Sequence, residues 1–232
     1  MASIVDSIRS VYQDNYSLLK LGGFSYFIYL LIGLITPGEN INIMNIILWI
    51  VIYYIFLGFC SIIINNRITQ NIQTLPSFDP IKFINISSKA FIISLPYLVI
   101  GYFVVNMIIG MFNFEGVPQQ VALWLIRFFI FSFLITALIN FSEKHKISDG
   151  FNISKLLSGV ADVLVFTILC LILIAIYSAF VVCPTLYLIY SFFDIGPLFK
   201  YVAVFFTTLN LAYVADYWGQ LHFDIESKNN YY

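Results

Sequence analysis

The sequence predicts an all-α integral membrane protein with six transmembrane helices and amphipathic interfacial helices on the cytoplasmic side, in loosely repeated units. Charged residues make up only 10% of the 232 residues, against about 25% in an ordinary soluble domain. The mean hydropathy is +0.93. Apolar stretches of about 20 residues recur, which is enough to cross a hydrocarbon core of roughly 30 Å. A soluble fold of this composition would expose large apolar patches and aggregate, so the soluble class is excluded.

Six apolar stretches are long enough to cross a membrane, and polar links separate them. The first is short and stops at Pro37. The third contains Pro96, which is expected to kink the helix. The fifth is longer than one span needs, so Pro184 is expected to kink or end it. The six stretches cover residues 21–36, 43–64, 90–112, 121–141, 161–193 and 197–217.

Basic residues lie mainly on one side of the predicted membrane. Alternation of the six spans places both chain ends and the links 65–89 and 142–160 on the same side. By the positive-inside rule this side is cytoplasmic, so we expect a multi-pass plasma-membrane protein with both termini in the cytoplasm. Nine of the eleven lysines and arginines fall there: Arg9, Lys20, Arg67, Lys82, Lys89, Lys144, Lys146, Lys155 and Lys228.

A polar phrase occurs twice, 73 residues apart. In "LPSFDPIKFI" and "SDGFNISKLL" a phenylalanine precedes a lysine by four residues, so that Phe78 aligns with Phe151 and Lys82 with Lys155. Each phrase is predicted to open a short amphipathic helix that lies in the cytoplasmic interface before a pair of spans. Lys82, Lys89 and Lys155 lie on the polar faces of these helices, so we expect them to contact lipid headgroups.

The interfacial helices divide the chain into three loosely similar units. Asp79 is expected to cap the second of these helices, with proline at its first position. Ser3 and Asp6 form a capping box that suggests a looser copy at the N-terminus. The alternative is that any link between membrane helices has amphipathic edges. The chain is thus interpreted as a single polytopic membrane domain, residues 1–232, with units 1–64, 65–141 and 142–217 and a cytoplasmic tail, 218–232.

The segment "GFCSIIINNRITQNIQTLPSFDPIKFINISSKAFIISLPYLVIGY" carries a resemblance to a known family. A span ends near a glycine, a short polar helix follows, and Leu-Pro-x-Phe leads into the next span; Gly58, Leu75, Pro76, Phe78 and Lys89 stand at those positions. This pattern resembles an uncharacterised prokaryotic multipass membrane family known as domain of unknown function 4013. The resemblance covers about residues 10–180. It implies the membrane fold and a plasma-membrane location in a bacterium or archaeon, and it brings no activity, cofactor or catalytic residue.

Arg127 is the costliest residue to place in a membrane, because it lies inside the fourth span. Asn106 lies at a similar depth in the third span, and Asp194 lies near the outer end of the fifth apolar run. The three residues are predicted to form an intramembrane polar cluster that binds a substrate or locks helices. The alternative is that Arg127 extends outward to a lipid phosphate.

The remaining polar groups do not match a catalytic or metal-binding pattern. Glu143 and His145, and likewise His222 and Asp224, are two residues apart, but no known metal spacing fits them, so they are interpreted as solvated loop residues. No glycine-rich phosphate loop or nucleophile motif is found. We therefore expect no metal, no cofactor and no catalytic residue. The net charge of −1 gives no reason to expect a nucleic-acid partner.

Two functional classes are compatible with these features. The first is a non-enzymatic structural or accessory protein that binds membrane lipids, with a membrane-protein partner or homo-oligomer as further candidates. The second is a transporter or permease component for a small solute or lipid, since repeats and prolines within spans suit moving helices. Against it, Asp162 and Asp216 sit at span ends rather than at mid-membrane. A water-filled cavity at the depth of Arg127 would favour transport.

Overall fold

The computed structural model describes residues 2–35, 42–71, 73–77, 79–112, 117–193 and 196–229. Within these ranges the chain is helical and contains no strand. The helices are α1 (Ile4–Gln13), α2 (Ser17–Gly33), α3 (Ile43–Ile68), α4 (Pro80–Phe112), α5 (Val117–Lys144), the 3₁₀ turn η1 (Ile147–Phe151), α6 (Ile153–Tyr177), the π-helical η2 (Ser178–Val182), α7 (Cys183–Phe193) and α8 (Gly196–Asn229).

The helices have the length and composition of membrane spans. Five of them in the described part are long and apolar enough to cross a bilayer: α3, α4, α5, the continuous α6–η2–α7 and α8. Helices α1 and α2 pass the same test only as a pair bent by 94°, which makes a sixth span if the pair is counted as one. The all-α membrane class is therefore confirmed, with five or six candidate spans.

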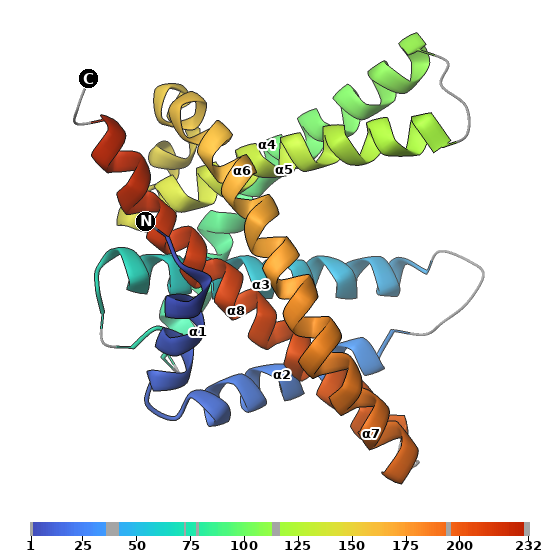
Figure 1. Ribbon diagram of the computed structural model, residues 1–232. Coiled ribbons are helices and arrows are strands. Elements are labelled where there is room, and N and C mark those ends of the chain that lie inside the picture. The colour runs from blue at the N-terminus through green and yellow to red at the C-terminus, as the bar shows by residue number, and fades with distance from the viewer. Residues whose placement is uncertain are drawn as a thin grey trace.

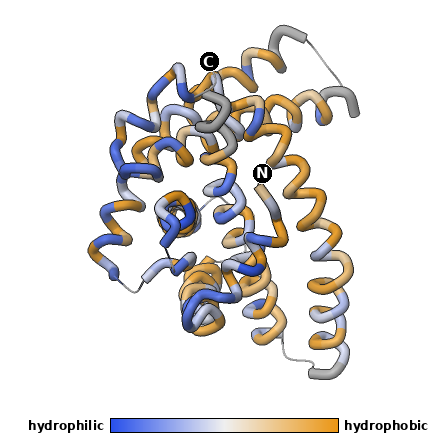
Figure 2. Tube along the Cα trace, turned by 60° about the vertical axis from the view of Figure 1, so that its left-hand side comes forward, coloured by the Kyte–Doolittle hydropathy of each residue, from blue (hydrophilic) through white to orange (hydrophobic). Residues whose placement is uncertain are grey.

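The bundle has two distinct ends (Figure 1). At one end lie α1, the last turns of α3 and α5, the first turns of α4 and α6, and the C-terminal turns of α8. We call this the polar end, because hydrophilic residues gather on it in Figure 2, where it is turned toward the viewer. At the opposite, apolar end, α2 leads to α3, α4 to α5 and α7 to α8.

The core lies in the half of the bundle toward the polar end. Helix α3 is central and packs against α4, α5 and α8, while α8 also packs against α1, α2 and α6. The buried side chains concentrate in residues 57–64, 86–93, 134–141 and 209–221. Toward the apolar end, large side chains are exposed instead, among them Tyr102, Phe103, Trp124, Leu125, Phe180 and Tyr187. In a bilayer such faces are suited to contact with acyl chains.

Two glycines allow α3 to approach its neighbours closely. A Cβ on Gly58 would lie 1.7 Å from Ser87 Oγ and 3.2 Å from the Cα of that residue in α4. A Cβ on Gly219 of α8 would lie 2.6 Å from the Cβ of Arg67. The distances of 1.7 Å and 2.6 Å are shorter than those that Cβ atoms adopt in proteins, so the α3–α4 and α3–α8 packing depends on glycine at these positions.

The two polar phrases do not form separate interfacial helices, and this prediction is wrong. Helix α4 runs without interruption from Pro80 to Phe112, and α6 continues from Ile153 in the same way. The physical reason in α4 is that no glycine or proline stands between Lys82 and Ala90, so nothing interrupts the backbone hydrogen bonds. The polar stripes are the first turns of long helices.

The weakest of the three predicted interfacial helices is the one that exists as a separate element. Helix α1 ends at Gln13, and Tyr16 adopts a left-handed backbone conformation with φ of 60° before α2 begins. The Oγ of Ser3 accepts a hydrogen bond from the backbone N–H of Asp6 at 3.4 Å, as the capping box predicts. The chain turns sharply here because the left-handed residue breaks the helix between two well-formed segments.

Helices α4 and α6 begin 73 residues apart, at the spacing of the two phrases. Asp79 Oδ1 accepts a hydrogen bond from the backbone N–H of Lys82 at 3.1 Å. At the same place in the second phrase, Asn152 Oδ1 accepts from the N–H of Lys155 at 3.2 Å. The predicted cap at Asp79 is confirmed, and an equivalent cap opens α6.

Two further boundaries differ from the sequence expectations. Of the two outcomes expected at Pro184, a kink or an end of the fifth run, only the end is contradicted: a π-helical segment, Ser178–Val182, precedes the proline, and the helix then continues as α7. Proline lacks an N–H and crowds the carbonyl four residues earlier, and the wider π turn accommodates both. Residues 218–232 are predicted from the sequence to be a cytoplasmic tail, but residues 218–229 are helical and form the last part of α8.

Candidate functional site

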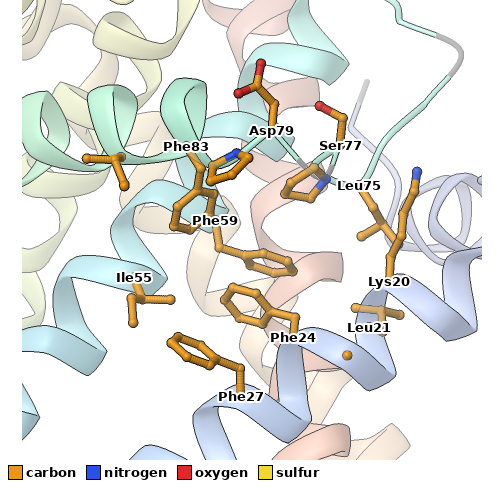
Figure 3. Close-up of a pocket in the computed structure, with 14 residues that line it drawn as sticks. Lys20, Leu21, Phe24, Phe27, Ile55, Phe59, Leu75, Ser77, Asp79 and Phe83 are labelled. Atoms are coloured by element: carbon orange, nitrogen blue, oxygen red, sulfur yellow. The ribbon is translucent and has the colours of Figure 1, made fainter.

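An apolar groove of about 340 Å³ opens at the polar end between α2, α3 and the start of α4. Figure 3 shows Phe24 and Phe27 of α2 opposite Ile55 and Phe59 of α3, with Phe83 of α4 alongside them. The volume lies within the roughly 300–1,000 Å³ range of ligand pockets. The groove therefore has the size and the lining of a binding site for an apolar chain.

Packed aromatic rings hold the walls of the groove in place. The rings of Phe24 and Phe59 are stacked, with centroids 4.2 Å apart and planes 22° apart. Phe83 meets Phe24 edge to face at 6.5 Å. Offset-stacked and edge-to-face contacts are the arrangements that aromatic quadrupoles favour. Three consecutive helices are thereby joined at one surface.

The third side of the groove is the loop before α4, and buried polar contacts fix it. The backbone N–H of Leu75 donates to Asp14 Oδ2 at 2.7 Å, and Leu75 itself is only 1% exposed. Asn66 Nδ2 donates to the carbonyl oxygen of Thr74 at 3.2 Å. Pro76 and Pro80 restrict the backbone of this loop further. These contacts hold Thr74 and Leu75 in place at the edge of the groove.

The rim of the groove is polar. Lys20, Ser77 and Asp79 line it, and Figure 3 shows them at one side of the aromatic cluster. The amino group of Lys20 forms an ion pair with Asp14 at 2.5 Å. Lys82, one turn into α4, is exposed close to this rim. The site thus combines an apolar interior with charged and hydroxyl groups at its mouth.

A buried polar network lies beside this site and joins α1 to α8. The Asp216 side chain is fully buried and accepts hydrogen bonds from Ser10 Oγ and Gln220 Nε2, both at 3.0 Å. Arg67 Nε of α3 lies 3.9 Å from the same carboxylate. Gln220 Nε2 also donates to Ser7 Oγ at 2.7 Å. Four polar side chains around one carboxylate compensate for the loss of its hydration.

The burial of Asp216 is not apparent from the sequence, in which this residue stands at the end of a predicted span. The available signal was the i, i+4 pair of Asp216 with Gln220, directly after the long apolar part of the sixth span. The serines that complete the network come from α1, and their arrival depends on the sharp turn between α1 and α2.

The predicted intramembrane cluster is only partly described. Asn106 is exposed and donates to the carbonyl oxygen of Tyr102 in its own helix at 2.8 Å. Arg127 is exposed, with its guanidinium carbon 6.0 Å from the centroid of the Trp124 ring. Asp194 lies outside the described residues. The hydrogen bond and ring contact described for the first two thus stay within single helices, and the three-residue cluster stays a prediction.

The three lysines predicted to contact headgroups occupy different settings at the polar end. Lys82 is exposed. Lys89 is half-buried, and its Nζ donates to the carbonyl oxygen of His145 at 3.5 Å, which satisfies the end of α5. Lys155 is exposed and pairs with Glu143 at 3.3 Å. Lys82 and Lys155 are therefore accessible for the predicted contact, whereas Lys89 serves helix packing.

The interpretation of the two histidines as solvated loop residues is wrong. His222 is only 5% exposed, and both ring nitrogens of His145 are buried without a hydrogen-bond partner among the described residues. Burial, together with the charges of Lys82 and Lys89, lowers the pKa of His145 to about 4. Its ring packs against Phe141, with centroids 5.3 Å apart. The described part of the chain contains no group of three or more metal-ligating side chains.

The buried His145 predicts an acid-sensitive fold. An unfolded chain takes up a proton near pH 6.5, whereas the folded chain resists protonation down to about pH 4. The stabilisation is therefore complete above pH 6.5 and is lost as the pH falls toward 4, by at most about 3 kcal/mol. The measurement is thermal unfolding of the detergent-solubilised protein at a series of pH values. We expect the melting temperature of His145→Asn to depend less on pH between 6.5 and 4 than that of the wild type. Asparagine tolerates the left-handed backbone at this position, where φ is 52°. An unchanged pH dependence in the variant would contradict this assignment.

No family model, curated protein or solved structure matches the chain. The resemblance to domain of unknown function 4013 therefore stays a prediction, as does everything it implies about source.

Proposed function

We propose that this chain is a non-enzymatic, structural or accessory multi-pass protein of the plasma membrane, and that it binds a membrane lipid in the groove between α2, α3 and α4. The proposal includes six spans, with α1 and α2 serving as one, and a polar end that faces the cytoplasm. The single observation that carries it is the apolar groove with its polar rim.

The distribution of basic residues supports the proposed orientation. Arg67, Lys82, Lys144 and Lys155 stand at the helix ends of the polar end. Cytoplasmic loops of membrane proteins carry such an excess of lysine and arginine. The groove opens beside these helix ends, and thus at the depth where headgroups meet acyl chains.

The chemistry of the groove suits a lipid better than a soluble ligand. Acyl chains in a bilayer are already out of water, so transfer from water contributes little to binding. Selectivity has to come from van der Waals contact with the aromatic walls and from headgroup contacts with the rim. Lys20 and Asp79 supply charges of both signs there, which suits a headgroup with a phosphate and a polar substituent. Lys82 lines a smaller neighbouring pocket together with Ser77 and Asp79.

The equivalent caps of α4 and α6 support the proposed repeat. Each unit would begin with a capped polar turn, at Ser3, Asp79 and Asn152 respectively. In the first unit this turn becomes a separate helix, and in the other two it continues into the span.

The transporter alternative requires a water-filled cavity at the depth of Arg127. The space there, about 280 Å³, is lined mainly by apolar and aromatic side chains. This lining favours the accessory role. The exposed apolar faces toward the apolar end leave room for a membrane-protein partner or a second copy of the chain.

The groove can be filled without disturbing its walls. Gly23 lines it, and a Cβ there would meet nothing within 4 Å. We expect Gly23→Leu to lower the amount of lipid retained in gentle detergent several-fold, measured by native mass spectrometry. Gly33→Leu is the matched control, because Gly33 lies on the same helix, faces equally open space and is outside the groove. Equal lipid retention by the two variants would refute the proposal.

A further inference from the structure

We infer that a second groove, between α4 and α5, binds a phospholipid whose phosphate pairs with Arg127. The phosphate would belong to the leaflet at the apolar end, so the inference rests on the proposed function for the placement of the bundle in the membrane. The groove has a volume of about 280 Å³, and Tyr97, Gly101 and Val105 of α4 face Ile130 and Leu134 of α5 across it.

The charge of Arg127 is best accommodated in this environment by an anion. A guanidinium stays protonated in proteins, and within a membrane span it has to be paired or to reach the interface. None of the ion pairs among the described residues includes Arg127, and no carboxylate lines the groove. The lipid phosphate is therefore the anion that the site lacks.

The direction of the side chain brings the guanidinium to the headgroup region. Side chains on a helix lean toward its N-terminus, and the N-terminus of α5 lies at the apolar end. The guanidinium carbon of Arg127 accordingly lies 6.0 Å from the ring of Trp124, one turn nearer to that end. Tryptophan favours the interface between membrane and water. A phosphate at this level can accept two parallel hydrogen bonds from the guanidinium.

The groove continues from the guanidinium toward the membrane interior. Arg127, Ile130 and Leu134 follow one another at helical spacing on the same face of α5. Opposite them, a Cβ on Gly101 would lie 2.9 Å from Ile130 Cγ2, so glycine is what lets the two helices approach here. One surface thus offers a phosphate ligand and, below it, an apolar channel for an acyl chain. Free phosphate would use only the first of these.

The test uses the delipidated full-length protein in detergent, titrated with phosphatidylglycerol, with the matching diacylglycerol and with inorganic phosphate. Native mass spectrometry and thermal unfolding report binding. We expect the wild type to bind the phospholipid at least ten-fold more tightly than the diacylglycerol, and to gain no stability from inorganic phosphate. Arg127→Gln should abolish this ten-fold preference, Arg127→Lys should retain part of it, and Asp194→Asn should leave it unchanged.

Gly23→Leu separates this inference from the proposed function. Filling the first groove should leave the phosphate preference at Arg127 intact, even if the first groove proves to bind no lipid. An undiminished preference in Arg127→Gln would overturn the inference. So would equal stabilisation by inorganic phosphate, or loss of the preference in Asp194→Asn.

Discussion

Replacement of Asp216 by alanine is expected to lower the free energy of unfolding by about 3 kcal/mol or more. The carboxylate is fully buried and accepts hydrogen bonds from Ser10 and Gln220, with Arg67 nearby. Its removal leaves the partly exposed arginine without this counter-charge and takes away one buried acceptor each from Ser10 and Gln220. Thermal unfolding in detergent should show the loss as a markedly lower melting temperature.

Two matched variants test the cause of this effect. Asp216→Asn keeps the shape and one acceptor oxygen but removes the charge, so we expect an intermediate loss. Asp6→Ala removes an exposed carboxylate from α1, and its effect should stay below about 1 kcal/mol, the usual size of a helix-dipole contribution. Similar losses in Asp216→Ala and Asp6→Ala would show that the buried network does not stabilise the fold.

Substitution of Gly58 by alanine should destabilise the protein by about 3 kcal/mol, at the upper end of overpacking effects. The new Cβ would lie 1.7 Å from Ser87 Oγ and 2.8 Å from its Cβ. Rotation of the serine side chain relieves the first contact but not the second, so α3 and α4 have to move apart. Gly33→Ala is the control, since a Cβ there meets nothing within 4 Å.

A compensating change can confirm that this contact is the cause. Ser87→Gly removes the two atoms nearest to the new methyl group and leaves the Cα at 3.2 Å. The double variant Gly58→Ala/Ser87→Gly is therefore expected to be more stable than Gly58→Ala alone, despite the lower helix propensity of glycine. Strictly additive losses would indicate that the two residues do not meet.

These effects bear on the proposed lipid site, because the network and the Gly58 contact hold the helices that form it. Asp14, the residue that directly follows α1, fixes Leu75 at the edge of the groove, and α1 supplies the serines around Asp216. Loss of the network should therefore release the loop before α4. Lipid retention is thus best compared among variants that keep their melting temperature.

Much of the fold follows from the sequence alone. The few charges, the recurrent apolar stretches and the one-sided lysines predict a helical membrane protein, and the helices confirm that class. Asp79 with Pro80 predicts the start of α4 correctly. These features are local: a cap, a proline or an apolar run acts within a few residues, so the sequence displays it directly.

The sites depend on contacts that no local pattern encodes. Phe24, Phe59 and Phe83 look alike in the sequence as apolar residues of separate segments, and only the packing of three helices makes them one groove. Asp216 looks like the solvated end of a span, and α1 buries it by turning back across α8. Composition therefore determines that the chain enters a membrane. The tertiary structure decides which of its polar groups leave water, because burial is set by neighbours that arrive from distant parts of the chain.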